Sequence, residues 1–161
     1  MKMKGMTVAL ATVALGAVAA GPAQASDAGL HSTVKKWELK VTPLVVSFKQ
    51  ADTGLATAPN TDTAEAAGGA LRKGLRSYKA AIVPIKTETA DYALGKKKIL
   101  TSIREFDIGL VAYETLLKKV NAGASKDSLK KSFVTANKRI DDAAKDEDAG
   151  LKLLGFKASS K

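Results

Sequence analysis

The chain has 161 residues, with 26 lysines and arginines against 16 aspartates and glutamates, which gives a formal net charge of +10. This length suits one domain, and a hydrophobic content of 45% is enough to build a core. Because the sequence contains no cysteine, it excludes disulfides, iron–sulfur clusters and thiolate zinc sites. The positive charge favours anionic surroundings but specifies no chemistry.

The first 25 residues have the pattern of a secretory signal peptide. Two lysines precede an uncharged apolar run over residues 6–20, and a helix-breaking Gly-Pro pair follows it. Ala23 and Ala25 supply the small residues of a cleavage site, so we expect cleavage before Ser26 and release of the product from the cell. The alternative is an uncleaved anchor, but the run is shorter than the roughly 20 residues that span a membrane.

Removal of residues 1–25 lowers the net charge to +8, because Lys2 and Lys4 are their only charged side chains. We expect residues 26–156 to form one helical domain and residues 157–161 to be a disordered tail.

The first predicted helix starts near Ser26 and Asp27, whose side chains can cap it. Pro43 lies off its apolar seam and is expected to kink or split the helix near Thr42. From Ala51 to Thr61 the periodicity is lost, which predicts a long loop. The seam follows helical steps of three and four residues: Leu30, Val34, Trp37, Val41, Leu44 and Phe48.

The second predicted helix opens with Asp62 and Glu65, which resemble a capping box. Pro84 is expected to end or bend this helix. Its seam contains Ala64, Gly68, Leu71, Leu75, Tyr78, Ile82 and Ile85.

The third predicted helix has Thr87 or Thr89 as its cap. The turn before it lies either near Pro84–Thr87 or at Gly95, and the sequence does not decide between them. Its seam is the most regular in the chain: Ile99, Ile103, Phe106, Leu110, Tyr113, Leu117 and Val120.

The fourth predicted helix follows a short turn in which Gly123 ends one helix and Ser125 caps the next. Gly155 closes this helix, with Phe156 placed to touch Leu151 in a Schellman-type cap. Its seam contains Leu129, Phe133, Ala136, Ile140, Ala144, Glu147, Leu151 and Leu154. Four amphipathic segments without strand-like alternation predict an all-α, antiparallel four-helix bundle.

No catalytic, cofactor or metal site is predicted. His31 is the single histidine, and the sequence contains no Gly-x-Ser-x-Gly motif that would present a nucleophile to it, so we expect it at the surface. The acidic stretch from Asp141 to Asp148 does not match a calcium-binding loop. Its helical spacing instead predicts three ion pairs, which join Asp141 to Lys145, Lys138 to Asp142, and Asp148 to Lys152.

Glu147 is the exception in this stretch, because it falls on the apolar seam. We expect the seam to have reached the end of the bundle there, so that the carboxylate meets water. The alternative is a buried carboxylate with a raised pKa.

The basic residues provide the candidate contacts with an anionic partner. Arg72, Arg76 and Lys79 share one outer stripe of the second helix, and three consecutive lysines form another cluster. Such clusters suit a polyanion or an anionic surface, although lysine and arginine also solubilise the outside of any bundle. The candidates are Arg72, Lys73, Arg76, Lys79, Lys96, Lys97 and Lys98.

Three segments carry a resemblance at the level of pattern: Ala23–Ala25, the stretch from Leu71 to Ile85, and the ending GLKLLG at 150–155. With them, the chain resembles small uncharacterised secreted helical proteins of actinobacterial type. The resemblance implies export and a helical fold, and it carries over no functional residue.

Together these features predict a secreted, non-enzymatic binding or structural module. Its basic outer face would associate with anionic polymers, the cell envelope or an acidic protein, whereas specific nucleic-acid binding is not expected. The alternative is a carrier that holds an apolar ligand between its helices, near Tyr78, Phe106 and Tyr113. An enzyme ranks third, because a helical bundle by itself implies no chemistry.

Overall fold

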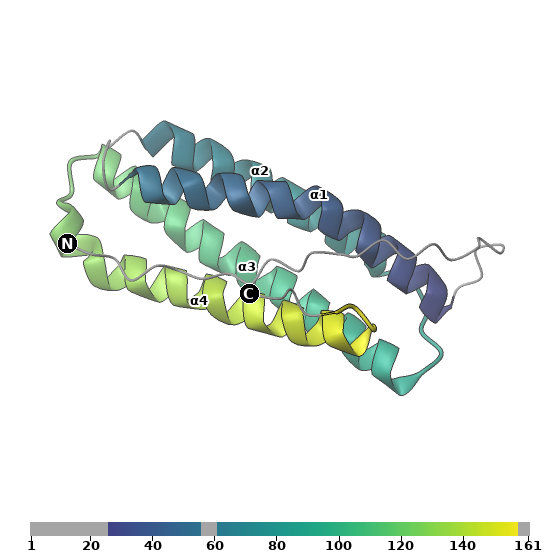
Figure 1. Ribbon diagram of the computed structural model, residues 1–161. Helices are drawn as coiled ribbons and strands as arrows, with labels where there is room; N and C mark the ends of the chain where they lie inside the picture. The colour runs from purple at the N-terminus through teal and green to yellow at the C-terminus, as the bar shows by residue number, and fades with distance from the viewer. Residues whose placement is uncertain (1–25, 56–60, 158–161) are drawn as a thin grey trace.

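A computed structural model describes residues 26–55 and 61–157, and within them the chain forms four helices and no strand. These are α1 (Asp27–Gly54), α2 (Thr61–Ile82), α3 (Ala90–Asn121) and α4 (Lys126–Leu153). Figure 1 shows them running alternately up and down in one elongated bundle, which confirms the predicted all-α four-helix architecture. The predicted signal peptide and residues 158–161 lie outside the described residues.

No helix in the described part of the chain is long and apolar enough to cross a membrane.

Two predicted boundaries of the first connection are wrong. Residues 51–54 belong to α1 rather than to a loop, because Ala51 and Leu55 pack against the core and extend the helix. Thr61 belongs to α2, where its hydroxyl donates to the side chain of Asn121 at the end of α3. Asp62 therefore lies inside the first turn of α2 rather than before it. Helix α1 also continues through Pro43 without a split.

The turn between α2 and α3 lies at the first of the two predicted positions. Helix α2 ends at Ile82, and α3 starts after Thr89, whose side chain accepts from the Tyr92 N–H at 3.4 Å. The Lys96 Nζ donates to the carbonyl of Val83 at 2.8 Å and to that of Ile85, so it closes the turn.

Gly95 is buried inside α3, where it allows close contact with α4. A Cβ atom on Gly95 would lie 3.0 Å from the carbonyl oxygen of Gly150, and one on Gly150 would lie 3.0 Å from that of Gly95. Farther along α3, a Cβ on Gly109 would lie 2.8 Å from a side-chain carbon of Ile140. These glycines let the two backbones approach one another, and α3–α4 is the most extensive helix contact of the bundle.

The predicted caps around α4 are confirmed. Gly123 adopts a φ of 91°, which favours glycine, and the Ser125 side chain accepts from the Ser128 N–H at 3.2 Å. At the other end Gly155 has a φ of 82°, and the Phe156 N–H donates to the Leu151 carbonyl at 3.0 Å. This bond is the signature of the Schellman motif.

Helix α1 packs on α2, α4 packs on α3, and the α2–α3 contact joins the two pairs. In the described residues α1 and α4 have no close backbone contact, so only side chains bridge that edge. At one end His31 stacks on Phe156 with ring centroids 4.2 Å apart.

Candidate basic surface and buried carboxylates

Arg72 contributes to the fold and is not a free contact for an anion. Its Nε lies 2.9 Å from Asp107 and its Nη1 lies 2.6 Å from Glu114, so one arginine of α2 bridges two carboxylates of α3. Its side chain is only 21% exposed. These partners raise the pKa of Arg72, the hydrogen bond to Asp107 contributing most. Arg72 thus stabilises the contact between α2 and α3.

Three more of the predicted contacts are engaged within the chain. Arg76 lies 3.5 Å from Asp107, although most of its side chain remains exposed. Lys96 binds the carbonyls of the α2–α3 turn, and Lys98 lies 3.6 Å from Asp146 of α4. The basic residues predicted along one side of α2 are therefore partly used to hold the neighbouring helix.

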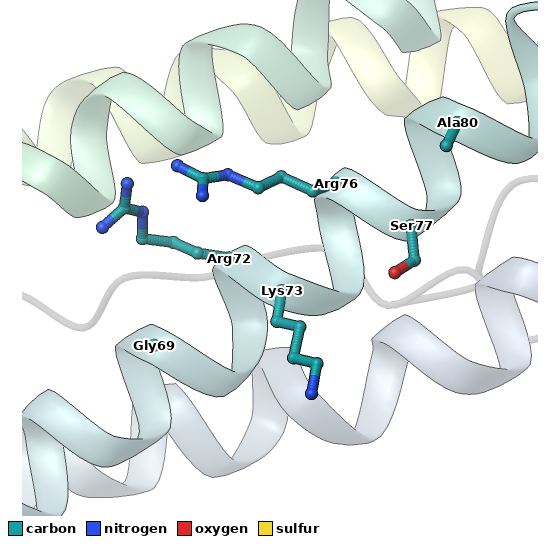
Figure 2. A pocket seen from close by; sticks show the side chains of 6 residues that line it. All are labelled: Gly69, Arg72, Lys73, Arg76, Ser77 and Ala80. Atoms are coloured by element: carbon teal, nitrogen blue, oxygen red, sulfur yellow. The ribbon is translucent and has the colours of Figure 1, made fainter.

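Lys73, Lys79 and Lys97 have no such role. All three are exposed, and no carboxylate in the described residues pairs with them. Lys73 lines a shallow hollow of about 360 Å³ on α2. Figure 2 shows its side chain pointing away from the arginines, which extend side by side in another direction. The hollow is lined by Gly69, Arg72, Lys73, Arg76, Ser77 and Ala80.

Lys79 and Lys97 line a second shallow hollow, of about 370 Å³, between α2 and α3. Two other cations, Lys96 and Arg104, also line it, and its lining contains no carboxylate. Val83 and Leu100 are among its apolar residues. The full lining is Lys79, Val83, Ala93, Lys96, Lys97, Leu100, Thr101 and Arg104. We call this hollow and the hollow of Lys73 together the basic surface.

The interior contains an unexpected pair of buried polar side chains, Glu38 and Tyr78, and the half-buried Glu147 interacts electrostatically with both. The Tyr78 hydroxyl donates to Glu38 Oε1 at 3.0 Å, and both residues are buried. Burial raises the pKa of Glu38 to about 7, although the hydrogen bond from Tyr78 opposes this shift. Burial, followed by the charge of Glu38, raises the pKa of Glu147 well above its ordinary value.

The bundle does not end at Glu147, because α4 continues for six more residues to Leu153. Glu147 is half-buried, its Oε1 is buried without a hydrogen-bond partner, and its raised pKa agrees with the alternative. Glu38 was missed by the sequence analysis. The available signal was its position four residues after Val34 and three before Val41, which places it on the buried face of α1.

The histidine and the aromatic residues that were also considered pack against other parts of the fold. His31 is half-buried against Phe156, and burial followed by the charge of Lys35 lowers its pKa. Tyr78, Phe106 and Tyr113 are buried in the core, and the Tyr113 hydroxyl donates to Asp52. The side chains that motivated a ligand carrier therefore pack within the core.

The acidic stretch of α4 forms two of its three predicted ion pairs. Lys138 lies 2.6 Å from Asp142, and Lys152 lies 2.6 Å from Asp148. The predicted pair of Asp141 with Lys145 does not form, because Lys145 lies 3.1 Å from Asp142 instead. Among the described residues, no group of three or more histidines, aspartates or glutamates is placed to hold a metal ion.

Comparisons with protein-family models, with curated proteins and with solved structures found no match to this chain.

Proposed function

We propose that this protein is an exported, non-enzymatic helical module that binds anionic polymers or the cell envelope through its basic surface. The second hollow is the observation that supports this most strongly. It gathers Lys79, Lys96, Lys97 and Arg104 at one junction of two helices, with no carboxylate in its lining. Clustered cations of this kind attract polyanions and increase their rate of association.

The cations differ in whether they form ion pairs within the protein, and this difference supports the proposal. Arg72 is committed to Asp107 and Glu114, whereas Lys73, Lys79 and Lys97 contribute no ion pair to the described fold. A cation that has no carboxylate partner within the protein can contact an external anion without giving up an ion pair. The binding residues are therefore expected among these three lysines, with Arg76 and Arg104 beside them.

A salt titration tests the proposal with inorganic polyphosphate as the probe. Binding of the full chain should be measurable at low salt and should weaken linearly in log–log coordinates as salt rises, because released counterions drive it. The triple variant Lys73→Gln, Lys79→Gln, Lys97→Gln should bind at least about tenfold more weakly at low salt, with a salt dependence shallower by roughly two to three ions.

A control variant distinguishes the effect of charges within the basic surface from the effect of the net charge of the whole chain. Lys119, Lys130 and Lys131 are also exposed and do not line either hollow, so replacing them with glutamine removes the same charge. This control should retain most of the affinity. No binding at low salt, binding indifferent to salt, or equal losses in the two variants would each refute a specific basic surface.

A further inference from the structure

One exposed stripe of α3 combines cations with large apolar side chains. Successive members are spaced three or four residues apart, so they share one side of the helix. None of them is acidic. We call these residues the outer stripe: Leu94, Lys97, Thr101, Arg104, Ile108 and Val111.

The apolar members of the outer stripe are unusually exposed for their type. Leu94 is 46% exposed, Ile108 38% and Val111 41%. They are half of the large hydrophobic side chains exposed in the described residues. Val83, at the end of α2, is 50% exposed and lines the second hollow beside Lys97 and Arg104. Apolar groups and cations are thus intermixed on one surface.

The opposite sides of α3 explain why this stripe is free. Ile99, Ile103, Phe106 and Leu110 form its buried seam, and Gly95 and Gly109 face α4. Asp107 and Glu114 face α2 through Arg72. No helix of the described chain is left to cover the remaining side, which extends about 26 Å from residue 94 to residue 111 at the rise of an α-helix.

The composition of the stripe favours a lipid surface over a dissolved polyanion. Lysine and arginine contact anionic headgroups, and exposed leucine, isoleucine and valine gain free energy by entering the boundary between headgroups and acyl chains. A dissolved polyphosphate contacts the cations but leaves the apolar side chains in water. Arg104 also pairs with the adjacent Glu105 at 2.8 Å, so Lys97 is the stripe's unpaired cation.

We propose that the outer stripe, together with Lys79 of α2 and Val83 just after it, docks the bundle on the surface of an anionic phospholipid bilayer without crossing it. This inference rests on the proposed function, since it selects a lipid surface among the anionic partners of the basic surface. In this arrangement the apolar residues of the stripe enter the boundary between headgroups and acyl chains, and Lys79 and Lys97 contact the headgroups.

Two single-cysteine variants test the docking face, because the natural chain contains no cysteine that would compete for a label. Val111→Cys places a polarity-sensitive fluorophore in the outer stripe. Val134→Cys places it on α4, at a valine that is 62% exposed and follows the basic pair Lys130-Lys131. A local reporter is needed because the apolar run at residues 6–20 can bind lipid independently of the bundle.

With phosphatidylglycerol vesicles, the label at residue 111 should shift to the blue and be quenched by doxyl-labelled lipid, whereas the label at residue 134 should not respond. Pure phosphatidylcholine vesicles should produce neither effect. Adding Lys79→Gln and Lys97→Gln to the Val111→Cys chain should raise the lipid concentration at half-response by about tenfold. Far-ultraviolet circular dichroism would verify that each variant keeps its helices.

Three results would overturn the docking face: no response at residue 111, equal responses at both labels, or a shift without lipid that grows with protein concentration. The last result would mean that a second copy covers the stripe. If polyphosphate binding persists in any of these cases, only this inference falls. If polyphosphate binding is also absent, the proposed function falls with it.

Discussion

The two sides of α3 differ in what their residues do. Toward α4, Gly95 and Gly109 remove side chains so that the backbones approach each other, and the contact is the most extensive in the bundle. On the outer stripe, Leu94, Ile108 and Val111 keep large apolar side chains exposed among cations. The first side contributes stability to the bundle, and the second leaves chemical groups free for a partner. One helix thus separates the residues that hold the fold from those that the proposed function assigns to a partner.

A large loss of stability is expected when the packed side is broken by Gly95→Val. The added Cβ would lie 3.0 Å from the Gly150 carbonyl oxygen and 2.8 Å from a Leu154 methyl, so α3 and α4 would have to separate. We expect the free energy of unfolding to fall by about 3 kcal/mol, measured by chemical denaturation.

Gly69→Ala is the matched control, because an added Cβ there meets nothing within 4 Å. Relief of glycine's conformational entropy should stabilise that variant by roughly 0.5–1 kcal/mol. A Gly95→Val chain as stable as the parent would show that α3 and α4 do not need this close contact.

The pH dependence of stability tests whether the Glu38 carboxyl is buried in the core. Below pH 4.5, the ordinary pKa of a glutamate, Glu38 is protonated in both states. Between pH 4.5 and about 7, the unfolded chain releases this proton while the folded chain retains it. Stability should therefore fall as pH rises through this window, by on the order of 3 kcal/mol.

Denaturation at a series of pH values checks this prediction, with Glu38→Gln and Glu147→Gln as comparisons. Each variant removes one carboxyl group and should flatten the slope of stability against pH. A wild-type slope that is level or rising between pH 4.5 and 7 would contradict the burial of the carboxylates.

The two adjacent cations of α2 should differ in their contribution to stability. Arg72→Met leaves Asp107 and Glu114 without their bridge and should lower the free energy of unfolding by about 1–2 kcal/mol. Lys73→Met removes an exposed cation without an ion pair and should change it by less than about 0.5 kcal/mol. Equal losses at both positions, measured by thermal and chemical unfolding, would erase the distinction between the two cations.

The smallest effect on stability is expected in the outer stripe. The double variant Ile108→Ser, Val111→Ser should keep the free energy of unfolding within about 0.5 kcal/mol of the parent, because both side chains already face water. Leu110→Ala, on the buried seam between them, should cost about 2–5 kcal/mol. Comparable losses in the two variants would show that the outer stripe is buried.

Helical periodicity was sufficient to predict the four helices, because each must bury one apolar face. Local chemistry also predicted the caps at Gly123, Ser125 and Gly155, since a helix end depends on a few neighbouring residues. The end of α1 and the role of Gly95 were not predictable in this way. Both depend on contacts with segments that are distant in the sequence, and helical periodicity does not report such contacts.

The candidate site was predictable only in outline. The sequence indicated a basic face of α2, but whether Arg72 is free depends on the rotation of α3, which places Asp107 and Glu114 against it. The second hollow needs cations from two helices and was therefore not visible in either segment alone. Glu38 was missed because a single carboxylate on an apolar face does not reveal which side chain will meet it.

The central claim is that the lysines of the basic surface bind a partner without holding the fold. The polyphosphate affinity of the Lys73→Gln, Lys79→Gln, Lys97→Gln chain should be compared with that of Arg72→Met. Both affinities are measured without denaturant, at a pH where both variants are folded. We expect the triple variant to lose affinity by about tenfold or more, whereas Arg72→Met, although less stable, should bind within about twofold of the parent. Unchanged binding in the triple variant, together with lost binding in Arg72→Met, would show that these lysines are not the binding residues.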